Sequence, residues 1–600
     1  MIKYFLRNKQ CLFIFGTKTF QLKLAILFLK QTYLFGGILM NYRDILTSVI
    51  IKGMIIMGYH NLRSMHKITV NGRKKNDDLL FKILKTNQNT EFGKKYHFNS
   101  IKSIEQYRNT VPLTTFKDYE DYIVRMIDNN ETNLITALPL VGYAQSSGSV
   151  GKRKFIPLTR DSVNVYTNYT VPRMLALADK YYKEQGKKGL IAGRGIYTDP
   201  AYNDFLPNGL PCSNAADVPA KELAFIYPYI LVSPIPRMFT ADEVDYRYLS
   251  FRFALEDKRT MYFFGVFFKD IADHIKYLEN NWRILADDIE FGRISPLAKA
   301  APEIEEIIKK TLSPNPLRAA EIRQECEKGF NSTILKRLWP NMQIISSIGT
   351  STFEPFADLT RTYAYSIPFD FSIYGASEGL FAATDSIESK KQLLLLESCY
   401  YEFISIDDGN DTNKILSINE LEIGKHYEIV ITNQSGLYRY RCGDVIIVLD
   451  YLNDCPYLQF AYRKGQLLNL TGEKTTEEHM REVIDRIAKK AGCTIQHWAA
   501  YNSTEDHPYH YVLLIENEEG IDLTPYSNYA HEALKKINVR YEYFYNTQGM
   551  DALVIKNLKS GTNKAWMQKK IEEGVSPSQV KPVRILDNRE KMDFFLSRIK

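Results

Sequence analysis

QSSGSVGKRK, residues 145–154, lies between two apolar stretches, 138–144 and 155–159, each of which predicts a short strand. A connection this rich in Ser and Gly has no side chain to pack, but it offers backbone N–H groups, hydroxyls and cations. Turn amides and a lysine can together satisfy the oxygens of a phosphate. The stretch predicts a polyanion-binding loop between two strands, and a solvated hairpin tip is the alternative.

This loop is not a Walker A motif. Ser146 stands where the first Gly of GxxxxGK[ST] would be, and Arg153 rather than Ser or Thr follows Lys152. The loop therefore does not assign the chain to the P-loop enzymes.

A second informative stretch is SIYGASEG, residues 372–379, which follows an apolar strand predicted over 369–373. Ligand-binding loops of α/β sheets gather at such strand ends. Gly375 allows close approach to the backbone, Tyr374 offers a flat ring for a base, and Glu378 offers a carboxylate for a metal ion. The alternative is an ordinary turn.

A third stretch, LYRYRCGDV at residues 437–445, leads into the apolar residues 445–449 and predicts a strand-turn-strand. Asp444 follows a Gly, and an ionised carboxylate there can accept hydrogen bonds from two ribose hydroxyls. Arg439 and Arg441 lie on the same segment. The alternative is a charged hairpin with a surface Arg–Asp pair, which contributes little stability.

The chain of 600 residues is too long for one core, so at least two domains are expected. Strands alternate with helical patterns up to about residue 461, which favours an α/β domain with a largely parallel or mixed sheet. After a hinge at 462–466, residues 467–600 have the size of a compact α+β domain. The predicted fold class is α/β, with a large N-terminal domain over 40–461 and a smaller, mobile C-terminal lid.

Hydrophobic periodicity and punctuation residues predict the individual elements. Residues 41–95 are expected to be helical up to a break at 90–94. In the body we expect a helix over 163–177 capped by Asp161, a helix over 268–278, and strands over 342–348 and 393–403. In the lid we expect helices over 477–488, 529–537 and 563–574 and strands over 497–501, 509–516 and 552–556.

Charge is unevenly distributed along the chain. Residues 1–75 carry thirteen Lys and Arg against the single acid Asp44, a net +12, whereas the whole chain carries +7, so the remainder is at −5. A mildly acidic body argues against a nucleic-acid-binding protein, which would carry basic residues on its folded surface. Residues 1–39 are basic and apolar without an uncharged run long enough to span a membrane, and we expect them to lie outside the fold.

Cysteine and histidine usage excludes two further classes. The seven cysteines are scattered, with no CxxC pair, which predicts reduced thiols in a cytoplasmic protein rather than a disulfide framework. The ten histidines form no HExxH motif, so a zinc hydrolase of that kind is not expected.

Taken in order, these stretches resemble the adenylate-forming superfamily, and more narrowly the Gretchen Hagen 3 (auxin-responsive promoter) family of acyl-acid amido synthetases. The resemblance covers roughly residues 60–600 and is carried by NTEFGK at 89–94, VPL at 111–113, SSGSVGKRKFIP at 146–157, IYGASEG at 373–379, LYRYRCGDV at 437–445 and GEKT at 472–475. The chain departs from the family pattern at Val150, in the order Lys581-Pro582-Val583-Arg584, and in residues 1–39.

The resemblance implies roles for individual residues. ATP would be held through its phosphates, base and ribose, and at the hinge, by Ser146, Ser147, Gly148, Ser149, Lys152, Tyr374, Gly375, Asp444, Arg463 and Lys474. Glu378 would help bind Mg²⁺, and Lys581 would come from the lid to the α-phosphate. Glu378 and Lys581 would thus be the catalytic residues.

The resemblance implies an ATP-dependent ligase. A small carboxylic acid would attack the ATP α-phosphate to give an acyl-adenylate and pyrophosphate, and the amine of an amino acid would then displace AMP. Such catalysis needs positioning and electrostatic stabilisation rather than a protein nucleophile. We expect a monomer without nucleic-acid partners or stable membrane insertion. An acyl-CoA ligase and a catalytically silent binding protein with this fold remain the alternatives.

The acid itself is not identified by the sequence. Its pocket is expected from 165–180, 225–270 and 342–350, where Tyr262, Phe263 and Phe267 are equally suited to a hydrophobic core. Arg237 could pair with a second carboxylate, although a solvent-facing arginine is the alternative.

Overall fold

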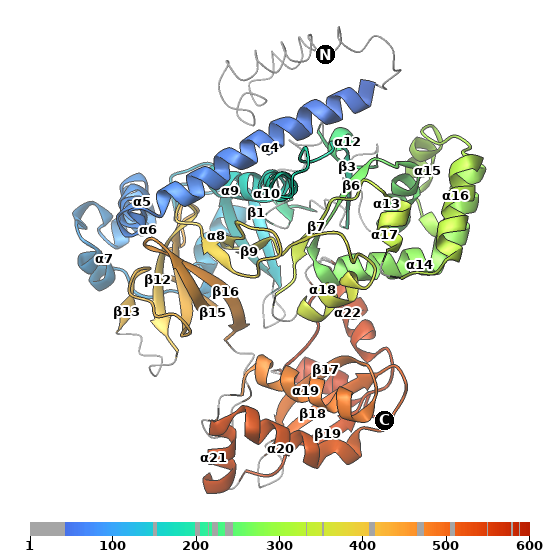
Figure 1. Ribbon diagram of the computed structural model, residues 1–600. Helices are drawn as coiled ribbons and strands as arrows, with labels where there is room; N and C mark the ends of the chain where they lie inside the picture. The colour runs from blue at the N-terminus through green and yellow to red at the C-terminus, as the bar shows by residue number, and fades with distance from the viewer. Residues whose placement is uncertain are drawn as a thin grey trace. The chain divides into compact units, whose positions relative to one another are not determined.

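A computed structural model of the protein describes residues 42–600, with gaps at 148–152, 199–203, 214, 216, 219–225, 234–243, 332, 351–352, 407–413, 465–467, 469–472, 474, 504–509, 549, 576, 578–579 and 587. The chain forms two compact units. The first comprises 1–72, 139–143 and 158–398, and the second comprises 73–138, 144–157 and 399–600. Figure 1 labels many of the helices and strands of both units.

Among the described residues, ten α-helices and nine strands lie entirely within the first unit. The helices are α4 (Tyr42–Ile68), α9 (Arg160–Tyr169), α10 (Val171–Glu184), α12 (Tyr227–Ile230), α13 (Tyr246–Glu256), α14 (Phe268–Glu290), α15 (Pro302–Lys309), α16 (Pro316–Glu327), α17 (Ile334–Leu338) and α18 (Glu354–Arg361). The strands are β3 (Arg194–Tyr197), β4 (Asp204–Phe205), β5 (Pro211–Ser213), β6 (Thr260–Phe267), β7 (Ile344–Ile348), β8 (Phe369–Asp370), β9 (Ile373–Ala376), β10 (Gly379–Ala383) and β11 (Gln392–Leu394). Two further strands, β1 (Leu140–Ser147) and β2 (Arg153–Thr159), have residues in both units.

The centre of the first unit is a parallel sheet of order β3-β6-β7-β8. Its strands are buried along most of their length, as expected for parallel strands that helices cover on either side. The predicted α/β domain with a largely parallel or mixed sheet is therefore confirmed. The expected strand over 342–348 is β7, and the expected helix over 268–278 is the first half of α14.

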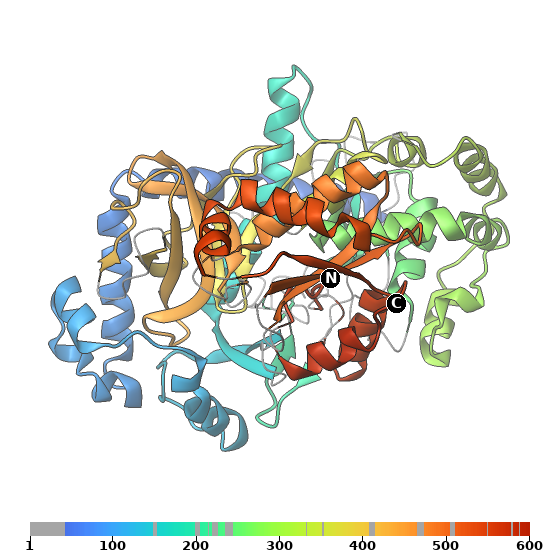
Figure 2. The ribbon, with the colours of Figure 1, turned by 90° about the horizontal axis from the view of Figure 1, so that it is seen from below.

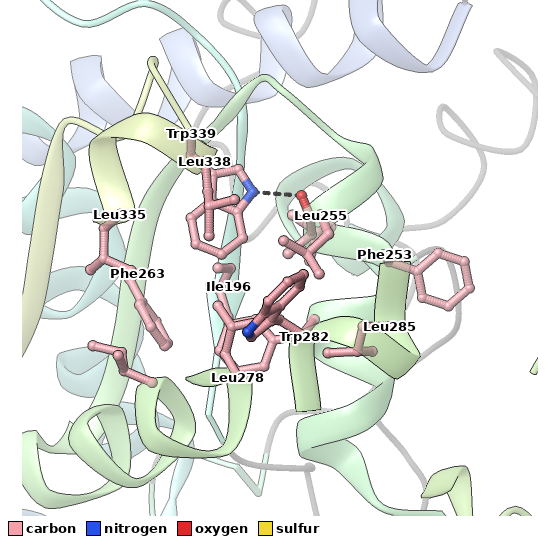
Figure 3. Packing of buried hydrophobic residues seen from close by; sticks show 14 of the residues in the cluster. Ile196, Phe253, Leu255, Phe263, Leu278, Trp282, Leu285, Leu335, Leu338 and Trp339 are labelled. Atoms are coloured by element: carbon pink, nitrogen blue, oxygen red, sulfur yellow. Dashed lines mark hydrogen bonds between the residues drawn. The ribbon is translucent and has the colours of Figure 1, made fainter. Parts of the chain in front are cut away.

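Aromatic and aliphatic side chains from α13, α14, α17 and β6 make one core against this sheet (Figure 3). Phe263 is fully buried in it, and Trp339 packs beside Leu338 while its indole N–H donates to the carbonyl of Ala254 at 2.6 Å. A buried indole needs such a partner because an unpaired donor would carry the full cost of desolvation. Tyr262, on the same strand, belongs to a neighbouring cluster formed with α4 and α10.

Helix α4 packs along α10 and α12, and Figure 1 shows its length beside them. Within the described part of the chain, Arg43–Ile68 is the one span whose length and composition would suffice to cross a membrane. Core helices pass the same test, and α4 begins with two tethered charges. Arg43 donates to the carbonyls of Pro228 (2.7 Å) and Val232 (3.1 Å), and Asp44 pairs with Arg194 at 2.9 Å.

Two predicted elements of the first unit are wrong in detail. The helix expected over 163–177 is two helices, α9 and α10, because the backbone breaks at Thr170 and Pro172 lies in the first turn of the second helix. Its cap is Thr159, whose hydroxyl accepts from the N–H of Ser162, and not Asp161. The strand expected over 369–373 is divided between β8 and β9 because Ser372 has a left-handed backbone, with φ of +54°.

The second unit combines a helical segment, an antiparallel sheet and a C-terminal α+β segment. Its helices are α5 (Gly72–Asn87), α6 (Glu91–Lys95), α7 (Ile104–Thr110), α8 (Glu120–Asp128), α19 (Glu477–Ala491), α20 (Ser527–Ile537), α21 (Val539–Gln548), α22 (Thr562–Glu572) and α23 (Arg589–Leu596). The first residue of α5, Gly72, is counted with the first unit. Its strands are β12 (Cys399–Ser405), β13 (Ile415–Leu416), β14 (His426–Asn433), β15 (Tyr440–Leu452), β16 (Cys455–Arg463), β17 (Ile495–Ser503), β18 (His510–Asn517) and β19 (Val554–Asn557). The first five pair antiparallel in the order β13-β12-β14-β15-β16. The strand expected over 393–403 is thus β11 and β12, two strands rather than one.

The C-terminal segment is a three-stranded sheet, β17-β18-β19, covered by helices on both faces (Figure 2). Successive residues of β17 point to opposite faces, as the pleat requires. Trp498 and Ala500 pack with α19 and α20, whereas Ala499 and Tyr501 pack with α22 and α23. This segment contains the predicted helices and strands of the lid. The division at a 462–466 hinge stays a prediction, and residues 1–39 lie outside the described residues.

The closest approach of α4 to α10 generates a stability prediction. A Cβ on Gly58 would lie 1.9 Å from the carbonyl oxygen of Pro172 and 2.7 Å from the Cβ of Ala176. Because the first clash is with backbone, Gly58→Ala must push the helices apart, and we expect a loss of about 1–3 kcal/mol in the free energy of unfolding. Denaturant unfolding measures it. His60→Ala, at an exposed position of the same helix, is the control, and equal stability of the two variants would contradict the packing.

Candidate active site

Three predicted ligand residues lie together on the antiparallel hairpin β9–β10 of the first unit. Ala376 pairs with Gly379, so Ser377 and Glu378 form the turn. Tyr374 is 6% exposed and its ring packs edge-on against Phe381 at 5.3 Å, while Glu378 is 5% exposed. The hairpin therefore carries the ring and the largely buried carboxylate on one short structure, and their role as ligands stays a prediction.

Gly375 is the residue at which the hairpin backbone is closely approached. A Cβ there would lie 3.1 Å from a Leu380 methyl and 3.7 Å from the ring of Tyr166. The hydroxyl of Tyr166 donates to the carbonyl of Ala376 at 2.5 Å, so α9 holds the end of β9 directly. This contact had no signal in the sequence beyond a tyrosine on a predicted helix.

Arg173 and Asp370 are two further residues at this hairpin that the sequence analysis missed. Both are 0% exposed, and they pair at 2.8 Å. Burial would raise the pKa of Asp370, but Arg173 and the hydroxyls of Thr384 and Ser346 outweigh it, so the pKa lies below its ordinary value. Because its pKa is lowered, the carboxylate of Asp370 is ionised at neutral pH. Asp370 stands two residues before the predicted ligand loop, which begins at Ser372.

The predicted ribose ligand Asp444 lies on β15 of the second unit, 5% exposed, with its backbone opposite Arg463 of β16. The strand-turn-strand predicted for 437–445 is wrong. The chain reverses earlier, after Asn433, whose side-chain oxygen accepts from the N–H groups of Ser435 and Leu437. Gly443, with φ of +77°, belongs to a bulge in a continuous strand, and bulges re-aim the side chains beside them.

The guanidinium of Arg439 is held by contacts within the protein. It donates to Glu402 at 3.0 Å and to the carbonyls of Arg108 and Val111 at 2.7 and 2.8 Å. Tyr438 beside it stacks on Phe92 of the NTEFGK motif at a centroid distance of 4.9 Å. This motif of the resemblance therefore anchors the segment that leads into β15.

Arg441 forms a forked pair with Glu428, at 2.8 and 2.7 Å, and Lys464 reaches the same carboxylate at 2.6 Å. Burial would raise the pKa of Glu428, but the hydrogen bonds from Arg441 and Lys464 prevail, so the pKa lies below its ordinary value. Lys464 adjoins Arg463 within the predicted hinge, and its N–H donates to Gly443 at 2.6 Å. One buried carboxylate on β14 thus joins β15 to the residue that follows β16.

Of the predicted phosphate loop, the structure describes the flanks. Strands β1 and β2 are neighbours in a sheet of order β2-β1-β5-β4, and the backbone of β1 runs through Ser146 and Ser147. The predicted strand-loop-strand is confirmed on both sides. The remaining predicted residues of this loop lie outside the described residues: Gly148, Ser149 and Lys152.

Lys581 is exposed and lies on the irregular segment after α22. Three residues later, Arg584 is anchored: it stacks on Trp498 at 4.7 Å, donates to the Trp498 carbonyl at 2.9 Å and lies 3.5 Å from Glu477. Backbone bonds join the same segment to Ala500 of β17. The segment that carries Lys581 is therefore fixed to the C-terminal sheet, while Lys474 lies outside the described residues.

The aromatic residues considered for the acid pocket divide. Tyr262 and Phe263 are 1% and 0% exposed, and the hydroxyl of Tyr262 donates to Ile230 at 2.6 Å, so both are core residues. Phe267 is half-buried and stacks on Phe353 at 4.2 Å. It alone of the three presents accessible surface, while Arg237 lies outside the described residues.

Magnesium fits this arrangement in one respect. Among the described residues no three His, Cys, Asp or Glu side chains gather as a metal cage. Mg²⁺ does not require one, because it keeps several waters and binds through one or two carboxylates plus substrate phosphates. Glu378 in its turn is a carboxylate of the kind that such a site uses.

Family models match the chain in three consecutive parts: the GH3 family N-terminal domain over 61–369, the GH3 family central domain over 392–463 and the GH3 family C-terminal domain over 478–590. The chain belongs to the GH3 family. The family predicted from the sequence motifs is therefore confirmed.

Full-length relatives agree with this GH3 assignment. The chain is 27% identical over 555 residues to the putative indole-3-acetic acid-amido synthetase GH3.9 of Arabidopsis thaliana, covering 87% of this chain and 93% of that protein. It is 26% identical over 573 residues to jasmonoyl–L-amino acid synthetase GH3.5 of Oryza sativa subsp. japonica, covering 90% and 96%. The solved structure of GH3.15 acyl acid amido synthetase matches with a TM-score of 0.77 at 25% identity, covering 90% of this chain and 96% of that one. The predicted fold class, a large α/β domain followed by a smaller C-terminal domain, is confirmed.

The buried carboxylate of Glu428 generates a pH prediction. Because the pKa of Glu428 is lower in the folded protein than its ordinary 4.5, its ionised form stabilises the fold above pH 4.5, and this stabilisation is lost as the pH falls through the folded pKa. Glu428→Gln should lower the free energy of unfolding at pH 7 by about 1–3 kcal/mol, since it leaves Arg441 and Lys464 without a charged acceptor.

Unfolding at several pH values measures this effect. The difference between Glu428→Gln and wild type should narrow below pH 4.5. The control is Glu422→Gln, which removes the exposed partner of Lys425. Its free energy of unfolding should stay close to that of wild type at every pH. A difference that is constant from pH 7 to the acid limit would contradict the account.

Proposed function

We propose that the protein is an ATP-dependent acyl-acid amido synthetase. Its full-length match to GH3 amido synthetases carries the proposal, and the β9–β10 hairpin with Tyr374 and Glu378 supports it. The carboxylate oxygen of a small acid attacks the α-phosphorus of ATP, and the bond to the bridging oxygen breaks as pyrophosphate leaves. An amino-acid nitrogen then attacks the acyl carbon, AMP leaves, and a proton is lost from nitrogen.

We propose the following roles for the chain's own residues. Tyr374 lies against the adenine and Asp444 accepts from the ribose hydroxyls, because each is a largely buried group of matching chemistry. The amides and hydroxyls at Ser146 and Ser147, with Lys152, hold the phosphates. Mg²⁺, held by Glu378, would neutralise charge on the phosphate oxygens.

Lys581 is proposed to stabilise the charge that develops on the α-phosphate oxygens during the first step. Its position supports this role, because the lysine is exposed while the segment that carries it is anchored to the C-terminal sheet. We further propose a monomer in the cytoplasm, and the second part agrees with the absence of a disulfide among the six described cysteines.

Product analysis tests the activity. Wild-type protein with ATP, Mg²⁺, an acid and amino acids should release AMP and pyrophosphate and form an amide. A panel of indole, jasmonate-like and benzoate acids is the starting set, because relatives named for different acids match equally well. AMP release that rises with coenzyme A and never with an amino acid would contradict the proposal and assign a CoA ligase. No pyrophosphate with any acid would indicate a binding protein.

The role of Lys581 generates a prediction that separates the two half-reactions. Lys581→Ala should lower the rate of pyrophosphate release by about 10²–10³-fold, the usual cost of removing one transition-state donor. Amide formation from a supplied acyl-adenylate should stay near the wild-type rate. Lys559→Ala, at another exposed lysine of the C-terminal segment, is the control. Equal losses in both half-reactions would assign Lys581 a structural role instead.

A further inference from the structure

The hairpin that carries Tyr374 and Glu378 enters and leaves through one buried carboxylate. Asp370 ends β8, two residues before the left-handed Ser372, and its Oδ1 accepts from the N–H of Ser372 at 3.1 Å. The same oxygen accepts from the hydroxyl of Thr384, directly after β10, at 2.6 Å. The N–H of Thr384 in turn donates to the carbonyl of Ser372 at 3.0 Å. The two ends of the hairpin are thus tied to each other and to Asp370.

Arg173 of α10 completes this cluster. Its guanidinium is forked on Asp370, at 2.8 and 3.1 Å, and also donates to the carbonyl of Thr384 at 2.9 Å. Its Nε donates to the carbonyl of Tyr169 at 2.8 Å, so the side chain is fixed against the end of the preceding helix, α9. Ser346 of β7 supplies a further hydroxyl to Asp370 at 2.7 Å. Contacts from α10, from β7 and from both ends of the hairpin therefore converge on one ion pair.

The turn of the hairpin is held from the same side. Tyr166, at the end of α9, donates to the carbonyl of Ala376 and packs over Gly375, whereas Arg173 at the start of α10 holds the base. Tyr166 and Arg173, seven positions apart in the chain, therefore contact the hairpin beside its turn and at its base. This arrangement leaves β9 little freedom to shift along its own axis.

Stability alone does not explain a pair of charges with no exposed surface. Taking two ions out of water costs several kcal/mol each, and well-packed apolar side chains of similar volume often stabilise a fold as well or better. Such a pair does fix geometry, since a forked guanidinium–carboxylate contact has a defined plane and length. The cluster is thus suited to holding a loop in one position.

We propose that Arg173 and Asp370 are positioning residues of the active site, which set the β9–β10 hairpin so that Tyr374 and Glu378 meet the nucleotide and its metal ion. The inference rests on the proposed function, because it assigns these two residues to ATP. Neither Arg173 nor Asp370 touches the reacting atoms in this account. They act through the backbone of 372–384, and their loss changes ATP affinity more than the affinity for the acid.

A pair of nearly isosteric variants tests the hairpin base gently. Thr384→Val removes the hydroxyl from Asp370 and Arg173, while Thr360→Val removes an equally buried hydroxyl that donates to Phe356 within α18. We expect Thr384→Val to raise KM for ATP severalfold and to speed amide hydrogen exchange in 372–384, with KM for the acid unchanged. Thr360→Val should do neither. Equal effects of the two variants would overturn the proposal.

A stronger test replaces the ions by apolar side chains. Arg173→Met/Asp370→Leu should fold, because the charges are removed together, but should lose about a hundredfold in kcat/KM for ATP, as a misplacement of about 1 Å can cause. The control is Arg252→Met, which removes another fully buried arginine of the first unit, bonded to Asp288 and Glu256. Melting temperatures of both are compared.

The measurements separate this inference from the proposed function. If wild-type protein neither binds nor cleaves ATP, the proposed function fails, whatever the exchange data show. If wild type is active and the double variant melts like the Arg252→Met control yet keeps wild-type ATP kinetics and wild-type exchange in 372–384, the positioning role is overturned. If the double variant does not fold, Thr384→Val against Thr360→Val decides.

Discussion

A fully buried negative charge at the end of β8 is the constraint on which the rest of the first unit depends. Asp370 cannot stay ionised in an apolar interior without a cation and hydrogen-bond donors, and Arg173, Ser346 and Thr384 provide them. Meeting that requirement joins α10, β7, β8 and the exit of β10 at one point. The packing of α4 on α10 then extends the same framework, since Arg173 is adjacent to the Pro172 that Gly58 contacts.

The second unit uses the same device with different residues. Glu402 and Glu428 are both 1% exposed at their side chains, and arginines or a lysine neutralise each of them. Glu428 lies opposite Val445, the neighbour of Asp444, so its pairs help to fix the backbone from which the proposed ribose ligand projects. In both units, charged residues near the proposed ligand residues form ion pairs within the protein. The proposed ligand residues lie on the short segments that these ion pairs hold in place.

Motifs made the family and the proposed ligand residues predictable, because Tyr374, Glu378 and Asp444 stand at defined positions in stretches with unusual glycine content. Hydrophobic periodicity predicted most helices and strands, because it depends on nearby residues alone. The errors have a common physical origin. The turn expected at Gly443 is a bulge because cross-strand pairing continues through it, and the strand expected over 369–373 breaks because Ser372 adopts a left-handed backbone.

Tertiary pairing explains what the sequence could not show. Arg173 lies on a predicted helix and Asp370 in a predicted strand, 197 residues away, and neither stands in a recognisable motif. An arginine on a helix is ordinarily solvated, so no local pattern distinguishes one that is fully buried. The contact of Tyr166 with Ala376 has the same character. Residues that hold a site through long-range contacts are visible only in three dimensions.

The central claim is that the chain activates a carboxylic acid by its attack on the α-phosphorus of ATP. An acid labelled with ¹⁸O in its carboxylate, turned over with ATP and an amino acid, tests this most directly, because the oxygen that bonds to phosphorus stays there when the amine displaces the adenylate. The account predicts one ¹⁸O in each AMP formed and none in pyrophosphate. Label in inorganic phosphate, with ADP as the nucleotide product, would contradict it.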